Sequence, residues 1–184
     1  LAQPGVQQLS PYVPGKPVDE LARELNLDPA KIVKLASNEN PLGPSPKVLA
    51  AIREELAELT RYPDGNGFAL KSLLAERCRV ELSQVTLGNG SNDILELVAR
   101  AYLAPGLNAV FSEHAFDAQT RVVFIANPNN PTGTWFGADA LNEFLQDVPE
   151  HVLVVLDEAY IEYAEGGDLP DGLDLGREVA VDSE

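Results

Sequence analysis

The clearest pattern in the sequence is a pair of short apolar runs that enclose a segment with helical spacing. The runs, at 122–126 and 152–156, contain no polar residue, which is typical of strands buried on both faces. Between them, residues 137–147 place their apolar side chains on one side of a helix. Strand, helix and strand in this order predict a parallel βαβ unit with a right-handed crossover.

The same patterns predict further elements upstream of this unit. Helices are expected at 18–25, 45–59, 68–79 and 91–102, and strands at 32–35, 84–87 and 108–111. Residues 1–16 are rich in proline and glycine and show no periodicity, so we expect an N-terminal arm there. Together these elements predict an α/β fold with three layers, in which a mostly parallel sheet is flanked by helices.

Polar residues follow both apolar runs of the βαβ unit. NPNNPTG occupies 127–133 and DEAY occupies 157–160. Because ligands bind outside the carboxyl ends of parallel strands, we expect one site built from both segments. A carboxylate at the end of an apolar strand, such as Asp157, needs a cationic partner, and no basic residue lies nearby in sequence. A bound heteroaromatic nitrogen would supply that partner, and the Tyr160 phenol would bond to the same ring.

A glycine turn at 88–90 precedes the helix expected at 91–102. A turn of this kind at a helix N-terminus forms an anion site, because free N–H groups and the helix dipole both favour negative charge. The plainer alternative is that Ser91 or Asn92 only caps the helix. The segment GNGSND lacks the third glycine of a dinucleotide fingerprint, so that class of ligand is disfavoured.

NPNNPTG followed by DEAY resembles the pyridoxal-phosphate aminotransferases of fold type I. Three further segments are similar to the histidinol-phosphate aminotransferases of that family, namely LASNENPLGPSP (35–46), RYPDGNG (61–67) and GNGSNDILELV (88–98). The resemblance covers nearly all of residues 1–174. It implies the large domain of that fold, pyridoxal 5′-phosphate as cofactor, and transfer of an amino group between glutamate and imidazole acetol phosphate in histidine biosynthesis.

The resemblance also implies roles around the cofactor ring. Asp157 would keep the pyridine nitrogen protonated, and Asn130 and Tyr160 would bond to the ring oxygen. Phe116 would stack on the ring. A cis bond before Pro131 would hold the Asn130 side chain against it.

The same resemblance implies which residues contact the phosphate and the substrate. The phosphate contacts would be Gly90, Ser91, Asn92 and Tyr62, the last from the partner subunit of a homodimer. Asn38 and Asn40 would lie at the substrate mouth. Plainer alternatives stay open: Tyr62 as an aromatic packed on its own domain, and 37–41 as a turn held by side-chain to backbone hydrogen bonds. No metal is implied.

The chain departs from the family pattern in two places. After Phe116 the family has more strand and helix before NPNNPTG, whereas this chain reaches Val122 almost at once. The family's Ser-x-x-Lys segment, which carries the Schiff-base lysine, has no counterpart, and residues 175–184 match nothing in the pattern. The chain is therefore expected to be inactive alone. It is either a longer protein with residues left out or a true fragment.

Two other functions remain open. The first is a different enzyme of the same fold, such as another aminotransferase or a threonine-phosphate decarboxylase. The segments NENP (38–41) and RYPD (61–64) are shared by near relatives, so they do not decide between these enzymes. The second is a non-catalytic ligand-binding or dimerisation fragment, which the missing lysine favours. Both would leave the expected fold unchanged. They differ in whether a longer protein supplies the lysine.

The composition limits the classes of partner that this chain is expected to bind. The 184 residues include 29 acidic and 13 basic side chains, a net charge of −16, which argues against nucleic acid and against an anionic membrane surface. A single cysteine, Cys78, favours a reducing compartment, and no apolar stretch reaches a membrane span, so we expect a cytoplasmic protein. The expected domains are an arm with a first small-domain helix (1–34), a cofactor-binding domain (35–174) and an unplaced tail (175–184).

Overall fold

The computed structural model describes residues 9–10, 15–35, 38–111, 117–164 and 170–173. Phe116 and the tail at 175–184 lie outside these residues. The chain divides into two compact units, residues 1–62 and residues 63–184, and each is described by itself. The domain boundary expected after residue 34 stays a prediction.

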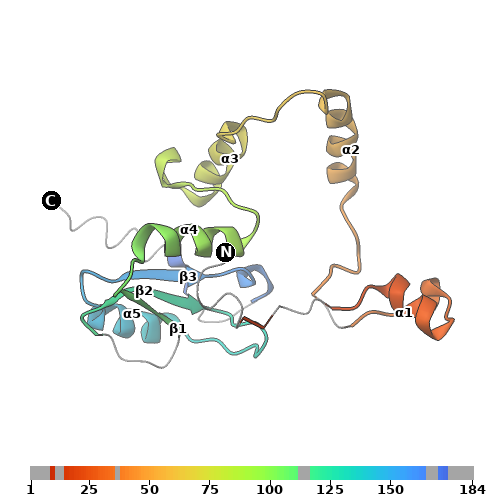
Figure 1. Ribbon diagram of the computed structural model, residues 1–184. Coiled ribbons are helices and arrows are strands. Elements are labelled where there is room, and N and C mark those ends of the chain that lie inside the picture. Colours follow the sequence, from red (N-terminus) through yellow and green to blue (C-terminus); the bar gives the residue numbers. More distant parts are fainter. Residues whose placement is uncertain (1–8, 11–14, 36–37, 112–116, 165–169, 174–184) are drawn as a thin grey trace. The chain divides into compact units, whose positions relative to one another are not determined.

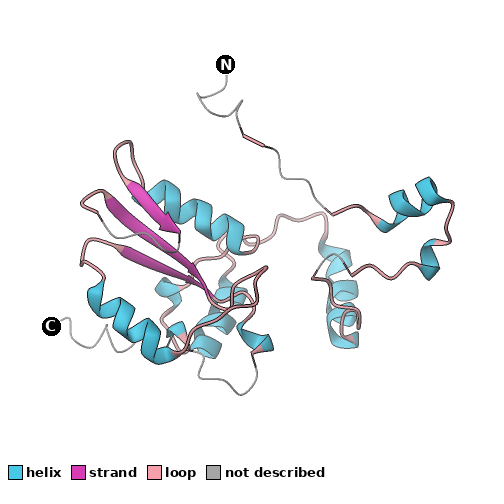
Figure 2. Cartoon of the chain, turned by 90° about the horizontal axis from the view of Figure 1, so that it is seen from below, coloured by secondary structure: helices cyan, strands magenta, loops and turns pink. Residues whose placement is uncertain are grey.

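The second unit contains a parallel sheet of three strands in the order β1-β2-β3 (Figure 2). The strands are β1 (Asn108–Phe111), β2 (Thr120–Ala126) and β3 (Leu153–Asp157). Helices α4 (Ser91–Tyr102) and α5 (Ala138–Asp147) lie on opposite faces of this sheet (Figure 1). This arrangement confirms the predicted α/β fold with three layers.

Burial of the central strand shows that both faces of the sheet are covered. Neighbouring residues on a strand point to opposite faces, and in β2 the neighbours Val122 and Val123 are only 0% and 3% exposed. On α5, Leu141 is 2% exposed. The start of the apolar run at 122–126 is therefore shielded from water on both faces of the sheet, which explains why it contains no polar residue.

The register of β2 and β3 brings the two polar segments together. Ala126 pairs with Asp157, and beyond this pair the Asn127 N–H donates to the Asp157 carbonyl over 3.0 Å. The segments NPNNPTG and DEAY therefore leave the sheet side by side, as the βαβ pattern predicts.

Three more helical segments of this unit have the following bounds: α3 (Phe68–Cys78), η4 (Leu82–Gln84) and η5 (Ile161–Tyr163). The predicted helix at 68–79 is thus confirmed. At its start, the Asp64 side chain accepts the N–H groups of Asn66 and Phe68 over 2.9 and 2.8 Å. These bonds hold the pKa of Asp64 below its usual range, the bond from Phe68 being the larger cause.

Two expected strands are not formed. Residues 32–35 have no strand structure, and residues 84–87 end η4 and continue as an extended loop. A strand requires a hydrogen-bonded neighbour, and neither segment has one among the described residues. Short apolar runs do not by themselves distinguish a strand from a packed loop. Both predictions were wrong for this reason.

The connection from β1 to β2 is unusually short for a parallel pair. It consists of residues 112–119, whereas parallel neighbours usually need about a dozen residues or more, with a helix among them. At the end of β1, Phe111 is 66% exposed and stacks on Phe124 with the ring centroids 5.0 Å apart. An apolar residue at the end of this edge strand is thus left uncovered.

Asp117 ties the start of β2 to the start of β1. Its carboxylate accepts hydrogen bonds from the Asn108 amide, the Thr120 hydroxyl and the Gln119 N–H. These bonds, the one from Asn108 first, hold the pKa of Asp117 below its usual range. A carboxylate with a lowered folded-state pKa stabilises the fold above its unfolded pKa and loses that contribution as the pH falls through the folded value.

We expect wild type to lose thermal stability more steeply than Asp117→Asn as the pH falls below about 4. Melting curves recorded between about pH 2 and pH 5 measure this difference. Asp147→Asn makes the same charge change at the exposed end of α5 and should keep the wild-type slope. Equal slopes for wild type and Asp117→Asn would contradict the role given to Asp117.

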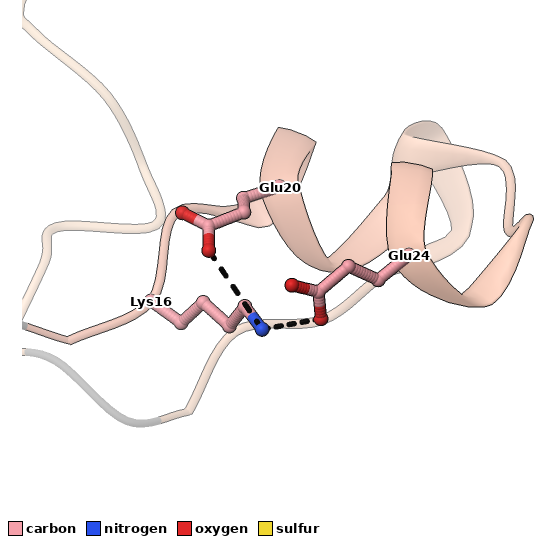
Figure 3. Close-up of polar contacts among 3 residues, drawn as sticks. All are labelled: Lys16, Glu20 and Glu24. Atoms are coloured by element: carbon pink, nitrogen blue, oxygen red, sulfur yellow. Dashed lines mark hydrogen bonds and ion pairs between the residues drawn. The ribbon is translucent and has the colours of Figure 1, made fainter.

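The first unit contains helices α1 (Val18–Leu25) and α2 (Pro46–Glu55) and the short segments η2 (Pro29–Lys31) and η3 (Leu56–Glu58). Ser45 caps α2 by accepting the Val48 N–H, with proline at the first helical position, as the sequence predicts. Near α1, the Lys16 ammonium lies between the carboxylates of Glu20 and Glu24 (Figure 3). These exposed pairs contribute little to stability.

Candidate functional site

Three loops of the second unit line one cavity of about 370 Å³. Two of the loops follow β2 and β3 at the carboxyl ends of these strands, and the third precedes α4. The cavity is lined by Asn89, Gly90, Ser91, Asn92, Ala126, Pro128, Asn130, Asp157, Ala159 and Tyr160. Six of the residues singled out from the sequence are therefore brought together here. Their roles stay predictions.

Asp157 carries the carboxylate of the cavity at the end of β3. Its Oδ1 atom accepts the Ser91 hydroxyl over 3.2 Å and the Ala159 N–H over 3.1 Å. None of the ion pairs formed by the described residues includes this half-buried carboxylate. Asp157 is thus a negative charge held in place by neutral donors, and its position suits a cationic ligand group.

Asn130 and Tyr160 form the second polar pair of the cavity. The Asn130 amide nitrogen lies 3.3 Å from the Tyr160 hydroxyl oxygen, within hydrogen-bonding distance. The two side chains come from different loops, one after β2 and one after β3. The peptide bond between Asn130 and Pro131 is cis, which confirms the prediction, and the bond between Asn127 and Pro128 is cis as well. Both side chains could therefore form a hydrogen bond to one ligand oxygen bound at this place.

The N-terminus of α4 closes the cavity on a third side. Its N-cap is Gly90, with φ of +75°, and none of the side chains in the described part of the chain caps the first turn. The alternative in which Ser91 or Asn92 caps the helix is therefore wrong, because the cap position falls on a glycine. The N–H groups of the first turn remain available, and the helix dipole favours an anion there. The Asp93 carboxylate in this turn is bonded to Asn89.

Asn127 supports the site from outside the cavity, a role that sequence reasoning did not single out. It is fully buried, its amide nitrogen donates to the Phe136 carbonyl over 3.1 Å, and its amide oxygen accepts the Phe136 N–H over 3.1 Å. The side chain thus closes the loop that carries Asn130. A polar residue directly between a buried strand and a proline is the sequence signal that would have indicated this role.

Comparison with known protein families shows to which family this chain belongs. The family described as "Aminotransferase class I and II" matches residues 30–118 and 107–180. The chain belongs to the class I and II aminotransferases.

Aminotransferase relatives with high identity confirm the narrower resemblance. Histidinol-phosphate aminotransferase 2 of Pseudomonas fluorescens strain Pf0-1 is 78% identical over 208 positions, which take in 95% of this chain and 56% of the relative. The protein of that name from Pseudomonas aeruginosa PAO1 is 72% identical over 207 positions, with the same shares. The chain thus spans about half the length of these aminotransferases.

The solved histidinol-phosphate aminotransferase of Sinorhizobium meliloti, in complex with pyridoxal-5′-phosphate, has the same fold. It superposes with a TM-score of 0.71 at 26% identity, over 92% of this chain and 53% of that one. The parallel sheet with helices on both faces is therefore the fold of an aminotransferase.

The aminotransferase alignments also locate missing residues inside the chain. The alignment of 208 positions is longer than the chain of 184 residues, so the relative has residues that this chain lacks. The family match is split into two segments that overlap at 107–118, a range that includes most of the short connection between β1 and β2. This confirms that an internal portion of the aminotransferase pattern is absent.

The remaining aminotransferase residues singled out from the sequence lie outside this cavity or outside the described residues. Asn38, Asn40 and Tyr62 belong to the first unit, and Phe116 is not among the described residues. Asn40 accepts the Leu42 N–H and donates to the Gly43 carbonyl, as in the plain turn considered for this segment. Tyr62 is fully exposed, so it is not packed on its own domain in this structure.

Glu158, the residue after Asp157, makes a contact outside the candidate aminotransferase cavity. Its carboxylate accepts the Gly172 N–H over 3.0 Å, and a Cβ at Gly172 would lie 3.0 Å from Leu156. Burial first, and then the charges of Asp171 and Glu162, raise the pKa of Glu158 above its usual range. Glu158 therefore holds the 170–173 segment near the end of β3.

We expect Glu158→Gln to be more stable than wild type at neutral pH. The folded state holds a proton on Glu158 more firmly than the unfolded chain does, so this group makes stability fall as the pH rises above about 4.5. Glutamine keeps an acceptor for Gly172 without the charge. Melting temperatures at several pH values should show a gap between the variants that widens from about pH 4 to pH 7. A variant less stable than wild type at pH 7 would contradict this account.

None of the described helices has the length and apolar character needed to span a membrane.

Proposed function

We propose that this chain forms the cofactor-holding part of a pyridoxal-phosphate-dependent histidinol-phosphate aminotransferase. The observation that carries the proposal is the convergence of three groups on one cavity. These groups are a carboxylate that pairs with no cation of the described residues, an amide and phenol pair, and the N-terminus of α4, which no described side chain caps. The two Pseudomonas relatives, at 78% and 72% identity, support the substrate assignment.

The ring end of pyridoxal phosphate fits the residues present. Asp157 lacks a cationic partner among the described residues and lies where a pyridinium N–H would supply one. Asn130 and Tyr160, 3.3 Å apart, would both bond to the ring oxygen. The carboxylate at the end of β3, and the amide and phenol pair from the loops after β2 and β3, thus match the two polar edges of one ring.

The phosphate end fits the N-terminus of α4. The first-turn N–H groups and the positive end of the helix dipole would bind the phosphate oxygens. The backbone at Gly90 leaves open space, because a Cβ there would have no atom within 4 Å. Gly90, Ser91 and Asn92 would contribute their N–H groups, and Tyr62 of a partner subunit would add its hydroxyl.

Pyridoxal phosphate supplies the electron sink that amino-group transfer requires. Asp157 would retain a proton on the ring nitrogen, which strengthens that sink, and Asn130 with Tyr160 would orient the ring. No lysine lines the cavity among the described residues. The amine that attaches the cofactor would therefore come from residues that this chain does not include, and the chain alone should bind without transferring an amino group.

The partners follow from the same proposal. Glutamate would donate the amino group and imidazole acetol phosphate would accept it. Two copies would form a dimer in which Tyr62 of each reaches the phosphate of the other, with Asn38 and Asn40 at the substrate mouth and Phe116 stacked on the ring. We place this reaction in the cytoplasm, where the single cysteine, Cys78, stays reduced. Light scattering of the purified protein tests the dimer.

Binding of pyridoxal phosphate to the 184-residue chain is the first test. Trp135 is the only tryptophan, and it lines the pocket that shares Asp157 and Ala126 with the candidate site, so its fluorescence should report binding. We expect saturable quenching that inorganic phosphate reverses by competition. A chain that is folded by circular dichroism and shows no quenching and no change in cofactor absorbance would overturn the proposal.

A chimera tests the reaction itself. It would keep residues 30–173 of this chain and take the residues that this chain lacks from the Pseudomonas fluorescens relative. We expect transamination of histidinol phosphate by the chimera and none by the 184-residue chain. Decarboxylation of threonine phosphate without transamination would favour the other enzyme of this fold. A chimera that binds the cofactor but acts on neither substrate would favour a non-catalytic role.

A further inference from the structure

Ser91 makes a contact that its expected phosphate role does not explain. It is the first residue of α4, yet its hydroxyl donates to Asp157 at the end of β3, 66 positions away in the sequence. The hydroxyl caps no backbone group of its own helix, because the N-cap is Gly90 and no described side chain caps the turn. The contact joins the loop at the phosphate end of the cavity to the carboxylate at the ring end.

This contact fixes one oxygen of the Asp157 carboxylate. Oδ1 accepts both the Ser91 hydroxyl and the Ala159 N–H, over 3.2 and 3.1 Å. No bond from a described residue to Oδ2 accompanies them. Two donors on one oxygen restrict rotation of the carboxyl group, and the other oxygen keeps its lone pairs for a ligand. Bonds donated to an ionised carboxylate are also stronger than those between neutral groups.

We propose that Ser91 is a positioning residue for the ring nitrogen of the cofactor. Its hydroxyl holds Asp157 so that Oδ2 faces the pyridinium N–H, and its side chain thereby acts on the ring and not only on the phosphate. This inference rests on the proposed function. It differs from the phosphate role because it makes the Ser91 hydroxyl matter even for a ligand without phosphate.

Phosphate-free pyridoxal is the probe that separates the two roles. Ser91→Val and Ser91→Thr have the same shape and differ in the hydroxyl alone. We expect Ser91→Val to raise the Kd of pyridoxal about tenfold, the effect of losing one bond to a charged group at a half-exposed site. The Kd of pyridoxal phosphate should rise by the same factor. Ser91→Thr should stay within about twofold of wild type for both ligands.

Combination with Asp157→Asn shows whether Ser91 acts through Asp157. If it does, Ser91→Val should add almost nothing to the loss already caused by Asp157→Asn, because coupled residues are not additive. Trp135 fluorescence gives all the Kd values, and circular dichroism confirms that each variant is folded. If Ser91→Val does not fold, Ser91→Ala replaces it, with Ser91→Thr still as the control.

Each outcome bears on one proposal or the other. A Kd for pyridoxal that Ser91→Val leaves unchanged, beside a raised Kd for pyridoxal phosphate, would make Ser91 a phosphate ligand alone and overturn the inference. Full additivity with Asp157→Asn would overturn it as well. Failure of wild type to bind pyridoxal phosphate would instead overturn the proposed function on which the inference rests.

Discussion

Asp157→Asn is expected to weaken the binding of pyridoxal phosphate to this chain by about a hundredfold, because removing one member of a desolvated charged pair typically costs 2–5 kcal/mol. The asparagine has nearly the same shape, so the loss measures the charge on the carboxylate. It also offers an N–H where the ring nitrogen needs an acceptor. Titration of Trp135 fluorescence with pyridoxal phosphate gives the Kd of both proteins.

Glu158→Gln is the matched control for this prediction. It removes the same charge one residue further along, from a carboxylate bonded to Gly172 and not to the cavity. The Kd of this control should stay within about twofold of wild type, because the Glu158 carboxylate does not line the cavity and makes no contact with a ligand there. If both variants lost affinity equally, the net charge near the cavity, and not the carboxylate of Asp157, would govern binding.

Asn127→Ala should have the second largest effect, on stability. It removes both hydrogen bonds to Phe136 and leaves the N–H and the carbonyl of this half-buried residue without these partners. A buried group that loses its partner costs about 1–3 kcal/mol, and these two are only partly buried, so we expect the free energy of unfolding to fall by about 2–4 kcal/mol. Urea unfolding of the chain, followed by circular dichroism, measures the change.

Asn129→Ala provides the control for Asn127→Ala within the same loop. Asn129 makes one side-chain bond, to the Thr132 hydroxyl, at an exposed place, so its loss should cost at most about 1 kcal/mol. Asn127→Ala should also weaken pyridoxal phosphate binding, because the loop that carries Asn130 loses its closure. Equal stability of the two variants would show that the buried amide does not hold this loop.

The prediction of individual elements succeeded where the signal was local. The helices at α4 and α5 and the capped start of α2 follow from spacing and capping residues a few positions apart, and the structure confirms them. The strands expected at 32–35 and 84–87 were wrong, because strand formation depends on a neighbour far away in the sequence. The run at 122–126 succeeded because its neighbours on both sides are present.

The residues of the candidate site also differ in whether the local sequence indicates them. Asp157 and Tyr160 were singled out because polar residues at the end of an apolar strand have few structural reasons to be there, and Asn130 through the family resemblance. Their roles stay predictions. Asn127 was overlooked, because an amide that holds a loop by two bonds looks like any other turn residue until its partner is known. The bond from Ser91 to Asp157 could not be predicted, since it depends on how α4 lies against the end of β3.

The sequence alone determined the fold class, the family and which polar residues follow the apolar strands, since these depend on residue type and short-range order. The absent internal portion was also visible in the sequence, as an abrupt step after Phe116. Only the tertiary structure decided the register that pairs Ala126 with Asp157, the two bonds that fix Oδ1, and the buried closure by Asn127. The physical reason is range: spacing and capping act over a few residues, whereas register and side-chain contacts arise from packing between distant segments.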